Sequence, residues 1–413
     1  MNGSLLRFMA IIGYIIALAA VDSRAQASNQ SQGSFDFNSE GVVFQTADSS
    51  SRVVMRFRMQ NWLTVTSATM AEGDDLNLST GSTDFVVRRL RLRFGGSLVD
   101  PRLTFNIQLS FTRADMDWND TQFPNIIRDA MIYWNFNKNL QVSFGQGKLP
   151  GNRQRVISSA DLEMPDRSIT NSAFTLDRDF GVQGFWRPIH GDMVVNVRGA
   201  ISSGDGRNQP VITGGGLAYT GRVEFLPFGA FTNGGDYFEG DLAREQKPKV
   251  SVGVSYQHNE NQTRTRGELG KNLYAQRTSN VLYADGLLKY DGFSLYGEYA
   301  QRTAVDPITY KDTTKKDYAA VFIGTGYMLQ ASYIFPSMWN VVARYAVTEA
   351  GSQLAGLSEY QKQVNIAAVI GYYINKHRIK INLEMGTNRS TLYNSNDLVH
   401  YNYYSRLNME LGI

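Results

Sequence analysis

The chain of 413 residues has no cysteine, only four histidines and ten prolines, and no apolar run near the roughly 20 residues of a membrane-spanning helix. The absence of cysteine excludes disulfides and thiolate metal sites. Its 41 basic and 38 acidic residues nearly balance, so there is no overall basic field to favour a nucleic-acid partner. Any electrostatic specialisation must lie in where the charges stand.

The first 25 residues have the pattern of a secretory signal. Arg7 is followed by 14 apolar residues from Phe8 to Val21, and small residues stand at Ser23 and Ala25. An anchoring helix is the alternative, but this apolar stretch is short for a span. We therefore predict a cleaved signal peptide over 1–25, a polar periplasmic lead-in over 26–50, and one domain over 51–413.

The rest of the chain favours β structure, with 22 Tyr, 22 Phe and 38 Gly in all. Residues 102–113 alternate strictly between apolar and polar side chains, the period of a strand with two different faces. The same period predicts about 16 strands, over 52–65, 84–98, 102–113, 126–136, 140–148, 178–187, 193–202, 217–226, 250–258, 280–290, 293–302, 320–335, 339–348, 362–374, 378–388 and 399–413.

The connections between these strands alternate between long and short. This sorting is typical of an antiparallel transmembrane β-barrel, with short periplasmic turns at one end and long external loops at the other. We predict this all-β fold. Residues 227–249 break the alternation, since a short turn is expected there, and we interpret them as an elaborated periplasmic turn.

The arginines of strand 84–98 decide which face meets water. Each of Arg89, Arg91 and Arg93 would cost roughly 2–4 kcal/mol if it faced lipid near the midplane. We therefore predict that they line an aqueous lumen, with the apolar residues between them facing lipid. Arg88 falls on the opposite face, at the end of the strand, where a headgroup or lipopolysaccharide phosphate would be its partner.

Aromatic residues near the ends of the strands are candidates for the interfacial girdles of such a barrel. They are Trp62, Trp134, Trp186, Tyr290 and Tyr372. The last strand reaches the end of the chain, as in outer-membrane barrels, although Ile413 stands where Phe is usual.

Three stretches resemble a known family. VRRLRLRFGGSLVDPRLTFNIQLSF, IIRDAMIYWNFNKNLQVSFGQGKLPGNRQR and LDRDFGVQGFW are similar to the phosphate-selective porin O and P family, in its Bacteroidetes branch. The resemblance implies a trimeric outer-membrane porin of 16 strands. It also implies a third external loop folded into the lumen, and a basic ladder that draws phosphate or polyphosphate through the narrow zone.

Carried onto this chain, the resemblance places the ladder on the first two strands, at Arg56, Arg58, Arg89, Arg91 and Arg93. It places the constriction on loop 149–176 and its approach, at Lys148, Arg153 and Arg155. The same loop carries Asp161, Glu163 and Asp166. A balanced loop opposite an arginine wall is also how a general porin builds a transverse field.

Guanidinium suits an anion path because it is always charged and presents two donors that fit phosphate oxygens together. The alternative is that these arginines only pair with lumenal carboxylates, for which the candidates are Asp129, Asp179, Glu224, Asp285 and Glu298. We predict a passive channel for small anions that contacts outer-membrane lipid and lipopolysaccharide and needs no cofactor or metal.

Two other functions stay open from the sequence, a general non-selective porin and a receptor or adhesin with a closed lumen. We do not expect an enzyme. An enzymatic barrel would need a Ser/His or Asp/His arrangement at the outer rim. His258 and His400 fall there, but neither accompanies a serine nucleophile motif.

Overall fold

The computed structural model describes residues 33–38, 40–72, 75–78, 81–116, 124–208, 216–355, 357, 361–392 and 398–413. The signal peptide predicted over 1–25 lies outside the described residues. The lead-in is described only from residue 33 onward, apart from residue 39.

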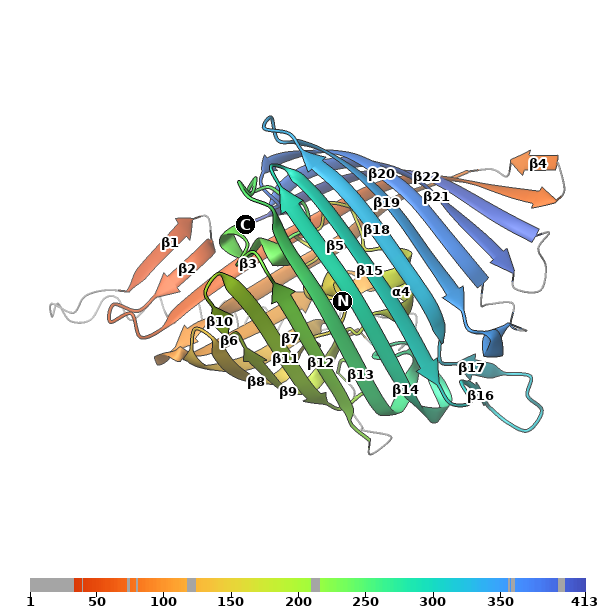
Figure 1. Ribbon diagram of the computed structural model, residues 1–413, viewed down its shortest axis with the longest axis horizontal. Helices are drawn as coiled ribbons and strands as arrows, with labels where there is room; N and C mark the ends of the chain where they lie inside the picture. The colour runs from red at the N-terminus through yellow and green to blue at the C-terminus, as the bar shows by residue number, and fades with distance from the viewer. Residues whose placement is uncertain are drawn as a thin grey trace, which may run out of the picture.

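Sixteen antiparallel strands form a closed barrel, which confirms the predicted fold (Figure 1). Strand β22 pairs with β3 along 15 residue pairs and so closes the ring. The barrel strands are β3 (Arg52–Glu72), β5 (Ser82–Leu98), β6 (Asp100–Ser110), β7 (Ile127–Asn137), β8 (Leu140–Lys148), β9 (Arg178–Trp186), β11 (Met193–Ser202), β12 (Ala218–Leu226), β13 (Lys249–Arg266), β14 (Leu269–Tyr290), β15 (Phe293–Ala304), β18 (Gly324–Ile334), β19 (Trp339–Ala350), β20 (Gln361–Asn375), β21 (Ile379–Leu392) and β22 (Leu398–Gly412).

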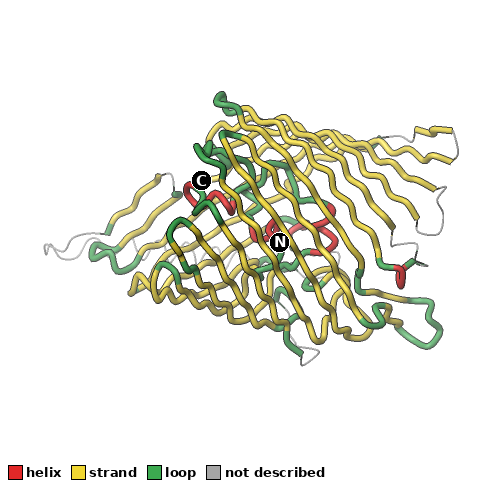
Figure 2. Tube along the Cα trace, viewed as in Figure 1, coloured by secondary structure: helices red, strands yellow, loops and turns green. Residues whose placement is uncertain are grey.

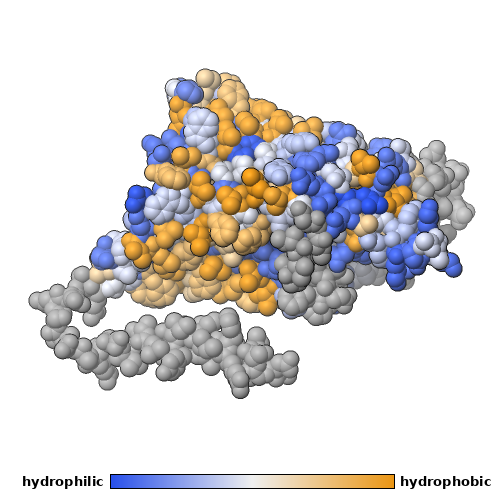
Figure 3. Space-filling model, turned by 90° about the horizontal axis from the view of Figure 1, so that it is seen from below, coloured by the Kyte–Doolittle hydropathy of each residue, from blue (hydrophilic) through white to orange (hydrophobic). Residues whose placement is uncertain are grey.

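The barrel reverses the burial pattern of a soluble protein. On β12, Arg222 and Glu224 are buried, while Val223 is 49% and Phe225 43% exposed. Figure 3 shows apolar residues over a broad area of the barrel wall, with hydrophilic residues gathered toward one end. Exposed apolar side chains and buried charged ones fit a wall between lipid and a polar lumen.

Smaller strands extend the barrel at both ends. On the periplasmic side these are β1 (Ser34–Asn38), β2 (Gly41–Gln45), which pairs with β3, and β10 (Ile189–His190). On the external side they are β4 (Asp75–Leu78), β16 (Ile308–Tyr310) and β17 (Tyr318–Ala320). The long loop expected between 258 and 280 is instead a continuation of β13 and β14, which turn tightly at Gly267 and Glu268.

Residues 149–177 cross the interior of the barrel and contain α3 (Arg153–Val156) and α4 (Ile169–Phe174). Figure 2 shows these short helices within the ring of strands. Hydrogen bonds join the loop to widely separated strands, for example from Asn152 to Glu298 (2.9 Å), from Thr170 to the carbonyl of Tyr327 (2.9 Å) and from Lys380 to the carbonyl of Leu162 (2.6 Å). The loop that crosses the interior of the barrel is therefore anchored on several sides.

The periplasmic segment 227–249 also folds inward. It contains the 3-10 turn η3 (Thr232–Tyr237) and meets the crossing loop, where the backbone NH of Glu239 donates to the carbonyl of Asp161 (2.8 Å). Two further 3-10 turns of the described residues, η2 (Arg113–Asp115) and η4 (Ser352–Leu354), lie on the external side. No helix among the described residues is long and apolar enough to cross a membrane.

Four of the five aromatic residues named as candidates for the girdle face outward, and their place at the membrane interface stays a prediction. Trp134, Trp186, Tyr290 and Tyr372 are 37–54% exposed on the outer wall near the periplasmic turns. Trp62 is the exception, since it points inward and its indole NH donates to Asn408 (3.0 Å). It shares the lumenal face of β3 with Arg58 and Gln60, since residues two apart on a strand face the same side, and β3 continues to Glu72, so Trp62 is not at the strand end.

Candidate functional site

Arginines stand opposite one another on the two strands that carry the predicted ladder. The register of β3 and β5 pairs Arg56 with Arg93 and Arg58 with Arg91, while Arg89 faces Gln60. Like charges directly opposite on neighbouring strands are destabilising. The fold must therefore offset these charges. It does so with different partners at different positions of the arginine column, by which we mean Arg56, Arg58, Arg89, Arg91 and Arg93.

The three deeper arginines have carboxylate partners from segments that enter the lumen or close the barrel. Arg89 donates to Asp166 (2.6 Å) and Arg91 to Asp115 (2.7 Å). Arg58 pairs with Glu410 on the last strand and also donates to Ser159 (2.7 Å). The partners suggested from the sequence contact other groups: Asp129 pairs with Arg178, Glu224 and Asp285 with Arg153 and Arg222, Asp179 accepts from Ser203, and Glu298 from Asn152.

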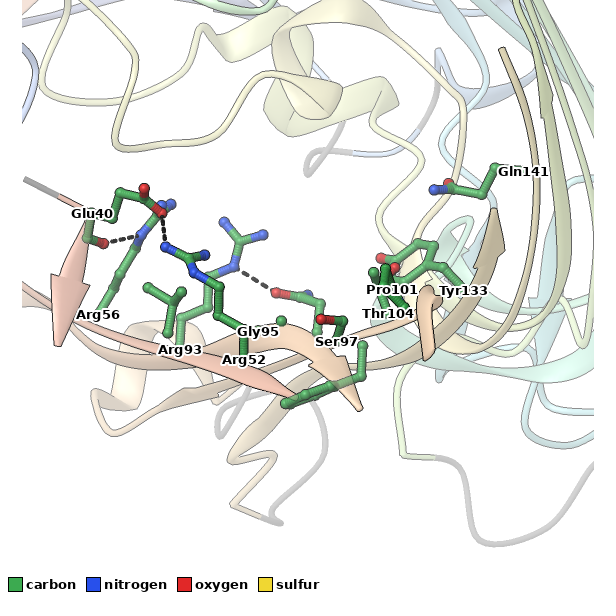
Figure 4. A pocket seen from close by; sticks show the side chains of 14 residues that line it. Glu40, Arg52, Arg56, Arg93, Gly95, Ser97, Pro101, Thr104, Tyr133 and Gln141 are labelled. Carbon is green, nitrogen blue, oxygen red and sulfur yellow. Dashed lines mark hydrogen bonds and ion pairs between the residues drawn. The ribbon is translucent and has the colours of Figure 1, made fainter. Parts of the chain in front are cut away.

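Arg56 and Arg93 have no carboxylate within ion-pair distance among the described residues. Arg56 donates to the carbonyl of Glu40 (2.6 Å) and Arg93 to the amide oxygen of Asn106 (2.5 Å). Both line a cavity of about 450 Å³ at the periplasmic end of the lumen. Figure 4 shows them on one side of this cavity beside Arg52, with Tyr133 and Gln141 on the far side.

The prediction that Arg88 faces lipid is wrong. The register between β3 and β5 shifts after Gln60, so Arg88 is an extra residue in a β-bulge. A bulge turns one side chain to the other face of a sheet. Arg88 therefore points inward and donates to Asp166 (2.8 Å).

The residues predicted at the constriction hold the crossing loop. Lys148 donates to the carbonyls of Val156 (3.0 Å) and Ile157 (3.2 Å), and Arg155 donates to Asp177 (2.7 Å). Arg153 has no exposed surface and donates to Asp285 (2.6 Å). Arg153 therefore anchors the loop to the wall and does not face open water, and a role in ion passage stays a prediction for Lys148 and Arg155.

The three acids of the loop have three different environments. Asp166 pairs with Arg88 and Arg89. Burial and the neighbouring Glu239 raise the pKa of Glu163 to about 7. Asp161 has no ion pair among the described residues, lines the periplasmic part of the lumen together with Arg93, and has a pKa raised by burial. Asp161 is thus the acid of this loop best placed to oppose the arginines.

Arg198 was missed by the sequence reasoning. Its guanidinium lies between the rings of Phe185 (5.0 Å) and Tyr237 (4.8 Å), and it lines the same part of the lumen as Arg93, in a cavity of about 530 Å³. A lone arginine among the apolar residues of 193–202 carries no signal of this role. Only the barrel brings β11 and the segment 227–249 to one place.

A second basic region lies on the external side of the crossing loop, in a cavity of about 250 Å³ that we call the external cavity. Its charged lining consists of Arg88, Arg89, Arg91, Arg128, Arg155, Arg167, Arg207 and Arg266 with Asp115, Asp166 and Asp177. The loop therefore has arginine-lined space on both of its sides.

Comparison with known proteins agrees with this architecture. The family model for phosphate-selective porin O and P matches residues 71–407. The outer membrane channel DcaP of Acinetobacter baumannii is 13% identical, with 90% of this chain and 99% of that chain covered and a TM-score of 0.54. An anion-selective porin from Comamonas acidovorans is also 13% identical, with 88% and 100% covered and a TM-score of 0.53.

Among curated proteins none matches the chain significantly. At 13% identity the two structural likenesses show the fold alone, whereas the family match covers most of the chain. The chain belongs to the phosphate-selective porin O and P family and is a channel-forming porin of the outer membrane of a Gram-negative bacterium.

Proposed function

We propose that this porin is a passive channel that prefers small anions, phosphate or polyphosphate among them. The observation that carries the proposal is the Arg56–Arg93 pair. Two arginines face each other across neighbouring strands, next to a water-accessible cavity, without a carboxylate partner among the described residues. Such an arrangement costs stability, which an anion passing between the two side chains would offset.

The column of arginines suits conduction as well as binding. Successive lumenal residues of one strand are ~6.6–6.8 Å apart, so an anion leaving one guanidinium reaches the next over a short step. Conduction needs attraction strong enough for entry and weak enough for exit. Arg89 and Arg91 already form ion pairs with Asp166 and Asp115. They therefore attract a passing anion more weakly than the Arg56–Arg93 pair does. Lys148 and Arg155 border the same route.

The crossing loop sets the size limit in this proposal. Hydrogen bonds from Arg58, Lys380 and Arg344 to its backbone carbonyls hold it against the wall. A loop fixed in this way gives a static constriction. The Comamonas acidovorans porin is anion-selective, which is consistent with the proposal. We also propose a homotrimer, as the family resemblance implies, with the apolar outer wall in contact with outer-membrane lipid and lipopolysaccharide.

A general porin is the second candidate, and Asp161 is the observation that favours it. This acid lies on the loop, lines the same space as Arg93 and has no cation within ion-pair distance among the described residues. Opposed charges across a constriction create a transverse field and reduce the preference for either ion.

The zero-current potential in a planar bilayer under a KCl gradient distinguishes the two. An anion-preferring channel gives a potential of the sign expected for chloride permeation, and phosphate added to both sides lowers the chloride conductance. A potential near zero or of the cation sign would favour the general porin, and absence of conductance would favour a receptor with a closed lumen.

A further inference from the structure

Aromatic rings gather around the lumenal cavity of about 530 Å³ that Arg93 and Arg198 also line, which we call the aromatic cavity. The four aromatic residues, all half-buried, are Tyr133 of β7, Phe185 of β9, and Tyr237 and Phe238 of the segment 227–249. Apolar surface left in contact with water costs about 25 cal/mol per Å². A path for small inorganic ions has no use for such surface, whereas pockets for organic ligands are lined largely by it.

The apolar lining of this cavity continues onto the crossing loop. Leu149, Pro150 and Val156 of the loop line the cavity, as does Met131 of β7. The side chains of leucine, proline and valine neither donate nor accept hydrogen bonds, and the methionine sulfur is only a weak acceptor. This part of the cavity therefore suits an apolar body better than a sugar, whose hydroxyls would lose their hydrogen bonds to water there.

Two arginines of the cavity have no carboxylate within ion-pair distance among the described residues, Arg93 and Arg198. The guanidinium of Arg198 lies between the rings of Phe185 (5.0 Å) and Tyr237 (4.8 Å) and donates to the Tyr237 hydroxyl (3.0 Å). These contacts hold the guanidinium plane in one orientation. A guanidinium binds a carboxylate through two parallel hydrogen bonds, so the cavity offers a fixed partner for one.

The segment 227–249 holds its two aromatic residues in place through its backbone. Lys289 donates to the carbonyls of Gly235 (2.8 Å) and Phe238 (3.0 Å), and Arg153 donates to the carbonyl of Asp236 (2.9 Å). The aromatic wall is therefore formed before any ligand arrives. A preformed site binds more tightly, because less conformational freedom is lost on binding.

We propose that the aromatic cavity is a subsite for organic anions that carry a carboxylate on a flat apolar body, of which aromatic carboxylates are the simplest class. The carboxylate binds Arg198 or Arg93, and the ring packs against Phe238 and Tyr133. Figure 4 shows Tyr133 across the lumen from Arg93. The inference rests on the proposed anion channel and deepens it, because it names a class of substrate other than inorganic phosphate.

Block of the chloride conductance tests the inference. The purified full chain in a planar bilayer is titrated at neutral pH with benzoate, acetate, glucuronate or benzamide. Benzoate should halve the conductance at a concentration about fivefold lower than acetate, the factor expected for one aromatic contact. Glucuronate, with a hydroxylated ring, should resemble acetate, and uncharged benzamide should not block. Equal half-block concentrations for benzoate and acetate would overturn the inference, as would block by glucuronate or benzamide at the concentrations effective for benzoate.

Variants of the aromatic residues locate the subsite through the ratio of the half-block concentrations of acetate and benzoate. Phe238→Ala removes a ring from the cavity, and Phe185→Leu removes a ring that holds Arg198; in both variants the ratio should fall toward one. Phe228→Ala is the matched control, since Phe228 is in the same segment, is 57% exposed and lines neither lumenal cavity. A ratio that stays at the wild-type value in both Phe238→Ala and Phe185→Leu would overturn the inference.

The subsite and the proposed function can fail separately. A zero-current potential of the chloride sign in KCl, together with equal block by benzoate and acetate, would support the anion channel and overturn the subsite. A potential near zero, together with stronger block by benzoate than by acetate, would support the subsite and overturn the anion preference.

Discussion

Removal of Arg56 and Arg93 should abolish most of the anion preference of the channel. Both side chains line the periplasmic cavity without carboxylate partners among the described residues. The double variant Arg56→Ala/Arg93→Ala therefore removes two lumenal charges and leaves no acid newly unpaired. Folding should be preserved, because the substitution also removes a like-charge contact between β3 and β5.

The size of the effect follows from Coulomb's law. A unit charge about 4 Å from a passing anion contributes about 1 kcal/mol in water, which is about a fivefold change in local anion concentration. Two such charges give about 2 kcal/mol, or roughly 30-fold. The Debye length falls from about 10 Å at 0.1 M salt to about 3 Å at 1 M, so the effect should be largest in dilute KCl.

The assay is the zero-current potential of wild type and variant, under gradients of equal ratio at low and high KCl. Lys311→Ala is the control, because it removes an exposed positive charge from the external hairpin of β16 and β17. Arg56→Lys/Arg93→Lys separates charge from shape: it should keep the potential but weaken the block by phosphate, since ammonium lacks the two-donor fork. A double-alanine variant with the wild-type potential at low salt would refute the reasoning.

Three further changes have expected outcomes. Asp161→Asn should strengthen the anion preference at neutral pH. In the wild type the preference should grow as pH falls, and at a higher pH than an ordinary aspartate would require because burial raises the pKa of Asp161; a pH dependence that persists in the variant would contradict this assignment. Glu163 has a pKa of about 7, against 4.5 for the free side chain, so the folded state retains a proton that the unfolded state releases. The free energy of unfolding should therefore fall as pH rises from about 4.5 through 7, by an amount on the order of 3 kcal/mol. Denaturant unfolding at pH 5 and pH 8 measures this, and Glu163→Gln should remove the difference. Gly145 has φ +127°, and a Cβ there would lie 2.2 Å from the carbonyl oxygen of Ala130. Gly145→Ala should therefore lower the yield of folded barrel, whereas Gly221→Ala should not, because there is open space around Gly221. Equal yields of the two variants would contradict the steric argument.

The sequence alone determined the barrel and the face of its arginines. Alternation with period two fixes which side chains share a face, and the cost of a charge in lipid decides that Arg89, Arg91 and Arg93 face the lumen. The barrel also follows from the alternation of long and short connections along the chain, whereas the inference about the faces is local, because it needs only neighbours along one strand. The same logic failed at Arg88, where a bulge in the pairing with β3 reverses the face.

The tertiary structure decided which arginines are neutralised. Asp115 lies in an external turn, Asp166 in the crossing loop and Glu410 on the last strand, and only the closed barrel brings them to Arg91, Arg89 and Arg58. It also buried Arg153 completely and placed Arg198 beside Tyr237. Alternation along a strand says nothing of contacts across the lumen, since these depend on how loops between distant strands fold inward. The tertiary fold therefore decides which arginine meets a passing ion, whereas the alternation along each strand decides only which face the arginine occupies.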